Sequence, residues 1–155
     1  MKVDIGISKK DREAIAAGLS RLLADSYTLY LKTHNYHWNV TGPMFNSLHT
    51  MFEAQYDELA LAVDEVAERI RTLGAYAPGS FSEFAAMTDL EEAKPGTGAE
   101  EMIRQLADDQ LKVAAAAEAL ATAADEAGDD VTTDLGIRRQ EVHQKNAWML
   151  RSMLA

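Results

Sequence analysis

Residues 46–74 read NSLHTMFEAQYDELALAVDEVAERIRTLG, and this stretch decides the fold class. Apolar side chains recur in it every three or four positions, which is the spacing of one face of an α-helix. Gly74 closes the pattern, as is typical of a helix C-terminus, where glycine tolerates the left-handed backbone conformation. We therefore expect a helix from about Asn46 to Gly74. Its inward-facing residues are Leu48, Phe52, Tyr56, Leu59, Val63, Val66 and Ile70.

A second long helix precedes this stretch, and a short helix follows it. Ser8 is the N-cap of the preceding helix, which we expect to run to about His37 and to stop before the helix-breaking pair Gly42–Pro43. The connection after the quoted stretch is long, and such connections in compact domains normally contain structure of their own. Ser80 with a glutamate three residues later resembles a capping box, so we expect a short helix at Phe81–Met87.

Two further long helices complete the chain. Thr97 and Glu100 form a capping box at the start of the third helix, which we expect to end near Gly128. Asp129 or Asp130 caps the fourth. The apolar positions of these two helices are Ile103, Leu106, Val113, Leu120, Leu135, Val142, Trp148 and Leu150. Four long helices and one short helix indicate a four-helix bundle.

Length and composition agree with one all-α domain. The 155 residues suffice for a single domain with a sizeable core, and 47% apolar with 26% charged residues is a globular composition. Three prolines and nine glycines are few, which favours helices throughout. We expect residues 1–155 to form one domain with a short N-terminal tail at residues 1–7. The predicted bundle carries one short extra helix, between its second and third helices.

Composition also excludes several functions. Cysteine is absent, so disulfides, iron–sulfur clusters and thiol nucleophiles are excluded, and a metal site must use histidine and carboxylates. No apolar run approaches the ~18 residues of a membrane span, and the first residues lack the apolar region of a signal peptide. We therefore expect a cytoplasmic protein without membrane contact. The net charge of −10 argues against a protein that coats nucleic acid with its whole surface.

Four potential metal ligands share one stripe of the quoted helix. His49 and Glu53 are four residues apart, and so are Asp64 and Glu68. At ~100° per residue, these four side chains fall within roughly a quarter of a turn. His37 stands just upstream, at the end of the preceding helix. Histidine and carboxylates together suit a first-row metal such as iron, zinc or manganese, and solvated acids on a helix face are the alternative.

One chain cannot gather all of these ligands around a single ion. Glu53 and Asp64 are eleven residues apart, or ~16 Å along a helix, whereas metal–ligand distances are near ~2 Å. A two-fold axis removes the difficulty if the helix packs antiparallel on its copy, centred between Glu58 and Leu59. Glu53 of one chain then lies level with Asp64 of the other. Each dimer would hold two identical sites, and a monomer would be inactive.

Two motifs, at a matching distance from each other, resemble the signatures of a known family. Residues 37–42, HWNVTG, followed by Leu48-His49 and Glu53, resemble the first signature of the Dps proteins (DNA-binding protein from starved cells, the mini-ferritins). Residues 63–69, VDEVAER, followed by Leu73-Gly74, resemble the second. The helix pattern is similar along the whole chain. The resemblance implies a ferritin-like four-helix bundle that assembles into a hollow dodecamer with 23 symmetry.

The same resemblance implies a ferroxidase centre at the two-fold interface. Its ligands, carried over by position, are His37, His49 and Glu53 from one chain and Asp64 and Glu68 from the other. The implied activity is that of an oxidoreductase that oxidises Fe(II), preferentially with hydrogen peroxide, and stores ferric mineral inside the shell. Such a protein sequesters iron and protects against oxidative stress. The family often has aspartate at the position of Glu53, and the longer side chain is expected to alter the second, weaker iron position.

Four further aromatic and histidine side chains are open to two interpretations. Trp38 follows a predicted ligand, and Trp148 matches a family tryptophan in the last helix. The resemblance makes both candidates for intercepting stray oxidising equivalents, and aromatic packing in the core is the alternative. We expect His34 and His143 to be packing or surface residues, with His34 close enough to His37 to support it.

The acidic second half of the chain has one implied function. Residues 91–134 contain twelve acids against three bases, which is typical of a solvated helix face. In the family, this region lines an acidic pore on a three-fold axis, and Asp130 and Asp134 are the expected pore residues. Their repetition around the axis would attract Fe(II). The neighbouring acids that we expect to be ordinary surface residues are Asp125, Glu126 and Asp129.

DNA and zinc are the alternative partners. Lys2, Lys9, Lys10 and Arg12 lie near the start of the chain, and twelve copies on one shell would add avidity. The alternative function is therefore a nucleoid-associated protein that compacts DNA and whose metal site is secondary. We expect such binding to be weak and to fall steeply with salt. In a third reading, zinc substitutes for iron and holds the dimer together.

Overall fold

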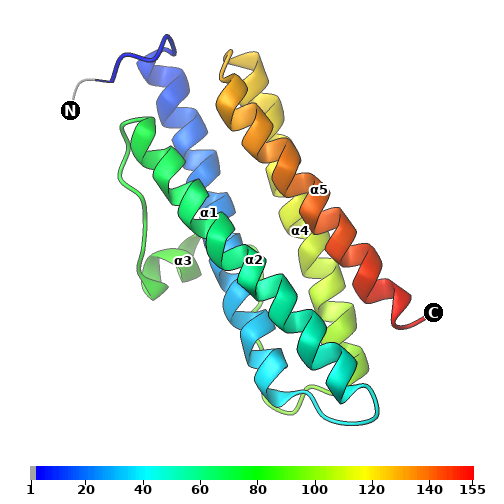
Figure 1. Cartoon of the computed structure of the whole chain (residues 1–155). Coiled ribbons are helices and arrows are strands. Elements are labelled where there is room, and N and C mark those ends of the chain that lie inside the picture. Colours follow the sequence, from blue (N-terminus) through cyan, green and yellow to red (C-terminus); the bar gives the residue numbers. More distant parts are fainter. Residues whose placement is uncertain (1–2) are drawn as a thin grey trace.

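The computed structural model describes residues 3–155, which form five helices (Figure 1). In chain order these are α1 Lys9–Asn39, α2 Phe45–Thr72, α3 Phe81–Met87, α4 Ala99–Glu126 and α5 Asp130–Ser152. The α1–α2 hairpin lies against the α4–α5 hairpin, and α3 packs beside α1. No strand occurs within residues 3–155. The prediction of an all-α four-helix bundle with a short helix between its second and third helices is confirmed.

Local capping explains most of the helix ends. The Ser8 hydroxyl accepts a hydrogen bond from the amide three residues later at 3.1 Å, and Ser80 does the same at 3.3 Å. Asp129 is the N-cap of α5, one of the two predicted candidates. At the other end of α2, Gly74 adopts a φ of +91°, as its predicted capping role requires. α1 continues two residues beyond the expected end at His37.

The expected capping box at the start of α4 is wrong. Gly98, and not Thr97, is the N-cap, and no side chain caps this helix. The Thr97 hydroxyl donates instead to the carbonyl of Lys94 at 2.7 Å, across the turn that precedes the helix. Glu100 lies in the first turn of α4 and pairs with Arg104 four residues later. The start of α4 was therefore predicted within two residues, but the capping contact expected to cause it is absent.

The bundle core is built from apolar side chains of all four long helices. α4 and α5 approach closely, because the alanine-rich part of α4 faces Gly136 of α5. A Cβ at Gly136 would lie 2.9 Å from the Ala117 carbonyl oxygen and 2.9 Å from Ala121 Cβ. Two side chains of α5 that were predicted to face the core are not fully buried. Val142 is half-buried, and Trp148 is 66% exposed. No helix among the described residues combines the length and apolarity that a membrane crossing requires.

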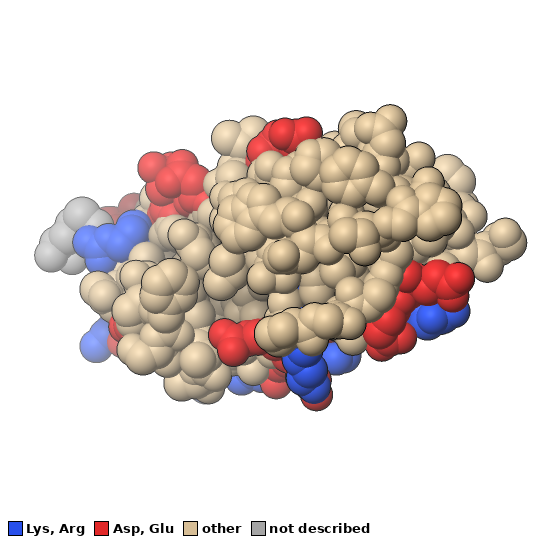
Figure 2. All heavy atoms as spheres, turned by 90° about the horizontal axis from the view of Figure 1, so that it is seen from below, with Lys and Arg blue, Asp and Glu red and all other residues tan. Residues whose placement is uncertain are grey.

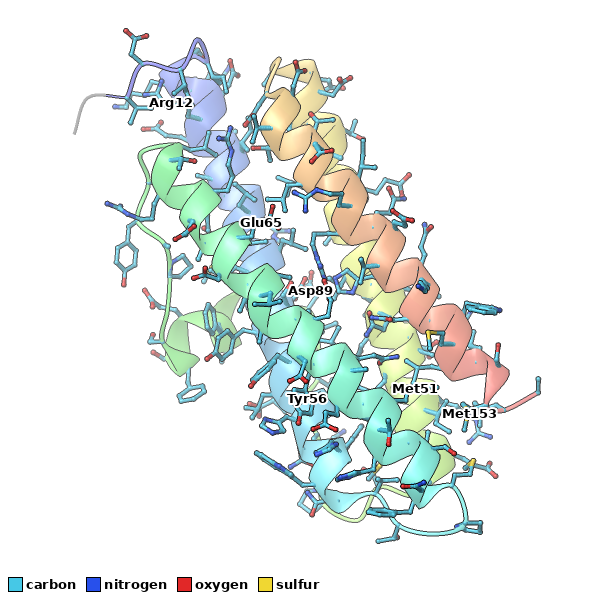
Figure 3. The ribbon with its side chains drawn as sticks, viewed as in Figure 1. Arg12, Met51, Tyr56, Glu65, Asp89 and Met153 are labelled. Carbon is cyan, nitrogen blue, oxygen red and sulfur yellow. The ribbon has the colours of Figure 1, made fainter. Side chains whose placement is uncertain are left out.

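The seam between α2 and α5 is closed by charged side chains. Few residues of the two helices approach closely, and arginine–carboxylate pairs span the gap. Arg138 of α5 binds Glu65 of α2 at 2.6 Å, and Arg139 of α5 binds Glu58 of α2 through both guanidinium nitrogens. Glu65 points from α2 toward this gap (Figure 3). α2 is consequently held to the core mainly by α1.

A buried polar network lies behind this seam. His143 is fully buried, donates from Nδ1 to Gln110 at 2.6 Å and accepts at Nε2 from Arg139 at 3.2 Å. Burial, and then the charge of Arg139, lower the pKa of His143 to about 3, so the ring is neutral. His143 is therefore a packing residue, one of the two interpretations that its sequence position allowed.

Asp129 departs from its expected role as a surface acid. Its side chain is buried because it caps α5 and binds Arg69 of α2 at 2.6 Å. Burial alone raises the pKa of Asp129, but hydrogen bonds from Arg69 and Thr132 outweigh it and hold the pKa below its usual value. Asp125 and Glu126 are exposed, as predicted.

The described part of the N-terminal segment packs against the end of α2. Arg12 donates to the carbonyls of Ile7 at 2.7 Å and Leu73 at 3.2 Å. A Cβ at Gly74 would come within 2.7 Å of the Val3 side chain, so the glycine also permits this close approach. Lys2, one of the basic residues of the predicted tail, lies outside the described residues.

Candidate metal centre

Two histidines meet where α1 ends and α2 begins. His37 is near the C-terminus of α1 and only 7% exposed, and His49 is in the second turn of α2. Their rings stack with centroids 3.7 Å apart and planes 17° apart. This end of the bundle is largely uncharged, with charged side chains gathered at its margins (Figure 2). The loop between the helices thus brings the two predicted imidazole ligands into contact.

Reciprocal hydrogen bonds define the protonation of this pair. His37 Nδ1 lies 2.7 Å from the carbonyl oxygen of His49, and His49 Nδ1 lies 2.9 Å from the carbonyl oxygen of His37. A carbonyl oxygen can only accept, so each Nδ1 carries the proton. In a neutral ring with this tautomer, Nε2 has a free lone pair and can bind a metal ion.

The three carboxylates of the predicted site are exposed on α2. Glu53 lies one turn beyond His49, whereas Asp64 and Glu68 lie toward the other end of the helix. None of the three forms a hydrogen bond or ion pair among residues 3–155, in contrast to the arginine-bound Glu58 and Glu65 on the same helix. The carboxylates that match predicted ligands are thus available, whereas Glu58 and Glu65 are bound to arginines.

One chain presents this site in two separate parts. Within residues 3–155, no three histidine or acidic side chains converge on a point that could hold a metal ion. His37, His49 and Glu53 form one part near the start of α2, and Asp64 and Glu68 form the other, more than two turns away. Leu61 lies between the two parts and is 78% exposed.

Tyr56 lies beside the paired histidines, although the sequence analysis assigned it only to the core. It is half-buried, and its ring meets that of His37 edge to face at 5.2 Å (Figure 3). Partial burial raises the pKa of the Tyr56 phenol, and the carboxylates of Glu53 and Asp57 raise it further. The phenol is therefore protonated at neutral pH. Its position three residues after Glu53 was the only signal in the sequence.

The two tryptophans lie at the surface of this chain. Trp38 is 58% exposed, and its ring is tilted by 39° against that of His34 with centroids 3.9 Å apart. Trp148 is 66% exposed on α5. Packing in the core of the single chain, which was the alternative to a redox role, is therefore wrong for both. His34 packs between Trp38 and Tyr56, which agrees with the packing role that was one of its two predicted interpretations.

The predicted pore residues are exposed near the start of α5. Asp130 is the first residue of the helix, and Asp134 lies one turn later. Asp134 accepts a hydrogen bond from Arg138 at 2.8 Å, which neutralises part of its charge. Both carboxylates face solvent, so their role at a three-fold axis stays a prediction.

Known proteins share both this sequence and this fold. The ferritin-like domain family matches residues 16–155. The chain is 37% identical to an uncharacterized low temperature-induced protein of a Nostoc strain over 155 residues, 99% of this chain and 87% of that one. It is also 37% identical to the DNA protection during starvation protein of Porphyromonas gingivalis, covering 94% of this chain and 91% of that one. The chain belongs to the Dps proteins of the ferritin-like family.

A solved Dps structure agrees with the fold in detail. The Dps protein of Vibrio cholerae superposes with a TM-score of 0.94 at 31% identity, over 100% of this chain and 98% of that one. That protein is described as a member of a broad superfamily of ferritin-like diiron-carboxylate proteins. Membership of the Dps family, which the two sequence motifs predicted, is thereby confirmed.

Proposed function

We propose that this Dps protein is a ferroxidase that oxidises Fe(II), preferentially with hydrogen peroxide, and stores the ferric product in a hollow dodecamer. It would thereby remove two reactants that together damage the cell. The observation that carries the proposal is the His37–His49 pair, whose Nδ1 protons are held by carbonyl oxygens at 2.7 and 2.9 Å. Both Nε2 atoms are thus prepared for a metal ion before it binds.

The remaining ligands would come from a second copy of the chain. Packing α2 antiparallel on its copy would place Asp64 and Glu68 of one protomer beside His49 and Glu53 of the other. The exposed Leu61 near the centre of this face would be buried on association. Each two-fold contact would create two equivalent sites, and a dodecamer would contain six such contacts.

The ligand set suits iron oxidation. Two neutral imidazoles and three carboxylates bind Fe(II), and the anionic oxygens stabilise the harder Fe(III) more strongly. Reduction of one hydrogen peroxide to water takes two electrons, which two Fe(II) ions supply together. No hydroxyl radical forms in that reaction. The exposed Asp130 and Asp134 would attract Fe(II) toward a three-fold pore once repeated around the axis.

A titration tests this function directly. Fe(II) is added without oxygen to the metal-free protein, hydrogen peroxide is titrated in, and ferric absorbance is followed. We expect a sharp endpoint at two Fe(II) per peroxide and loss of that endpoint in Asp64→Asn. Glu65→Gln is the matched control, because this neighbouring carboxylate binds Arg138. An endpoint no different from that of buffer would refute the proposal.

The DNA-compacting alternative is weakened by the structure near the N-terminus. Arg12 is engaged with the carbonyls of Ile7 and Leu73, and Lys9 lies 3.6 Å from the Glu13 carboxylate. Fewer cations are therefore free to contact phosphates. A gel shift at ~0.15 M salt decides between the two functions, since we expect no retained DNA there. Zinc as the resident ion would instead give a site that binds metal and leaves peroxide unreacted.

A further inference from the structure

Side chains of three helices are joined by hydrogen bonds across the middle of the bundle. Gln110 of α4 accepts from His143 of α5 at 2.6 Å, and Arg139 of α5 donates to His143 at 3.2 Å. Arg139 also binds Glu58 of α2. These contacts place this part of α2, α4 and α5 at one level of the bundle. Gln55 lies one turn before Glu58, on the buried face of α2, so it points into the core at this level.

The first helix reaches the same level. Lys32 of α1 binds Asp109 of α4 at 2.7 Å, and Asp109 is the residue before Gln110. Thr33 follows Lys32 in α1 and is fully buried. Each of the four long helices therefore contributes at least one buried polar side chain to the centre of the bundle.

Several polar atoms at this level have no hydrogen-bond partner among residues 3–155. They are the oxygen and the nitrogen of the Gln55 amide, the amide nitrogen of Gln110, the hydroxyl of Thr33 and Nε of Arg139. Within the described part of the chain, every buried side-chain atom that lacks a partner belongs to this set. Buried polar atoms are normally paired, because burial without a partner costs them their hydration. Their gathering at one level therefore indicates a binding site.

The unpaired atoms determine what kind of molecule the site accepts. The N–H groups of Gln110 and Arg139 only donate, the carbonyl oxygen of Gln55 only accepts, and a hydroxyl such as that of Thr33 does both. A molecule that satisfies this set must itself both accept and donate hydrogen bonds. A metal ion does not fit, because N–H groups cannot coordinate it. Internal water molecules pair with sets of polar groups of this kind.

The charges around the site favour a neutral molecule. The Arg139 guanidinium is balanced by Glu58, and the Lys32 ammonium is balanced by Asp109. Burial lowers the pKa of His143 to about 3, so its ring is uncharged at neutral pH. An added ion would therefore be buried without a counter-charge, which costs far more than burying a neutral polar group.

We propose that the centre of the bundle binds a small neutral molecule with O–H groups, water or hydrogen peroxide, between the amides of Gln55 and Gln110. The molecule accepts a hydrogen bond from the Gln110 amide nitrogen and donates one to the Gln55 carbonyl oxygen. It thereby joins α2 to α4, which lie diagonally across the bundle. Water and hydrogen peroxide share this chemistry, because both donate through O–H and accept through oxygen lone pairs.

The seam between α2 and α5 provides the way in. Few residues of these two helices approach closely, and the Glu58–Arg139 pair closes the seam beside the site. The Glu58 side chain is 38% exposed and that of Arg139 is 5% exposed, so the pair leads from solvent to the buried level. Entry needs movement of these long side chains, and no helix has to unfold.

The first test is a crystal structure of the full-length, metal-free protein at a resolution that shows ordered water. We expect at least one molecule within hydrogen-bond distance of both the Gln55 amide and the Gln110 amide nitrogen. A second crystal is soaked in hydrogen peroxide before freezing. Elongated density for two bonded oxygen atoms would show that peroxide also occupies the site, and unchanged density would assign the site to water. A Gln55 amide bonded directly to Gln110 or Thr33, with no molecule between them, would overturn the proposal.

A measurement in solution gives an independent test. Oxygen-17 magnetic relaxation dispersion counts the buried water molecules that exchange slowly with solvent. Gln55→Leu removes the amide at a similar side-chain volume, and we expect it to lose at least one such molecule per chain. Gln144→Leu makes the same change on the exposed side of α5 and should lose none. Equal numbers in wild type and a folded Gln55→Leu would overturn the proposal.

The wild-type crystals keep the test decisive if Gln55→Leu does not fold, which circular dichroism of the variant would show. Neither measurement involves iron. A failure of this proposal therefore leaves the ferroxidase function standing, and a failure of the peroxide titration leaves this site unaffected.

Discussion

A mixture of two inactive variants should regain a defined part of the activity. Glu53→Gln removes a ligand from the histidine part of the site, and Asp64→Asn removes one from the other part. Both side chains are exposed and unpaired in the single chain, so neither change should disturb folding. In a dimer of one chain of each kind, one site carries both defects and the other carries none. Random pairing at equal amounts makes half of all dimers mixed, so about a quarter of the sites are intact.

The assay is peroxide-driven Fe(II) oxidation after the two variants are unfolded together and refolded. We expect about a quarter of the wild-type rate from the mixture and almost none from either variant refolded alone. The control mixture is Glu53→Gln with His49→Gln, which lie in the same part of the site and should restore nothing. Activity in the first mixture no higher than in the control would show that the site is not shared between chains.

Three further predictions concern stability. Gly136→Ala should lower the free energy of unfolding, measured in urea, by about 1 to 2 kcal/mol, because the new Cβ would lie 2.9 Å from the Ala117 carbonyl oxygen. Gly79→Ala is the control, because a Cβ there meets open space, and it should lower that free energy by less than half as much. Since His143 has a pKa of about 3 in the folded chain and 6.5 as its reference value, the unfolded chain binds the extra proton between these values. The free energy of unfolding should therefore fall as pH drops below 6.5, by up to about 1.4 kcal/mol per pH unit from this residue, and His143→Gln should flatten that slope in urea titrations at several pH values. Glu58→Leu should cost about 2 to 3 kcal/mol in the same assay, because it leaves the buried Arg139 guanidinium without its carboxylate, and a loss below 0.5 kcal/mol would contradict that role.

Helix ends could be predicted where the capping contact is local. Ser8, Ser80 and Asp129 each accept a hydrogen bond from an amide three residues later, so a short stretch of sequence contains both partners. The prediction that Thr97 caps α4 was wrong, because its hydroxyl donates to the Lys94 carbonyl, a contact that depends on the preceding turn. The prediction that Trp148 faces the core was wrong for another reason. Helical periodicity identifies an apolar face, but it does not show whether the same chain covers that face.

The predicted site shows the same division between local contacts, which the sequence predicts, and contacts between helices, which it does not. The spacing of His49 and Glu53 on one face of α2 follows from the helix alone. The contact between His37 and His49 depends on how the loop between α1 and α2 folds back, and no pattern in the sequence describes that. The contact of Tyr56 with His37 likewise joins two helices, so its spacing indicated only a core residue.

The stacking of the His37 and His49 rings means that the two imidazoles do not act independently. Each residue also provides the carbonyl that fixes the other ring's tautomer. If one ring is lost, the remaining ring loses its stacking partner and becomes freer to turn its Nε2 away from the ion. The affinities for Fe(II) of the two single variants and the double variant should therefore be strongly non-additive. A chain that loses one of these histidines gains little from keeping the other.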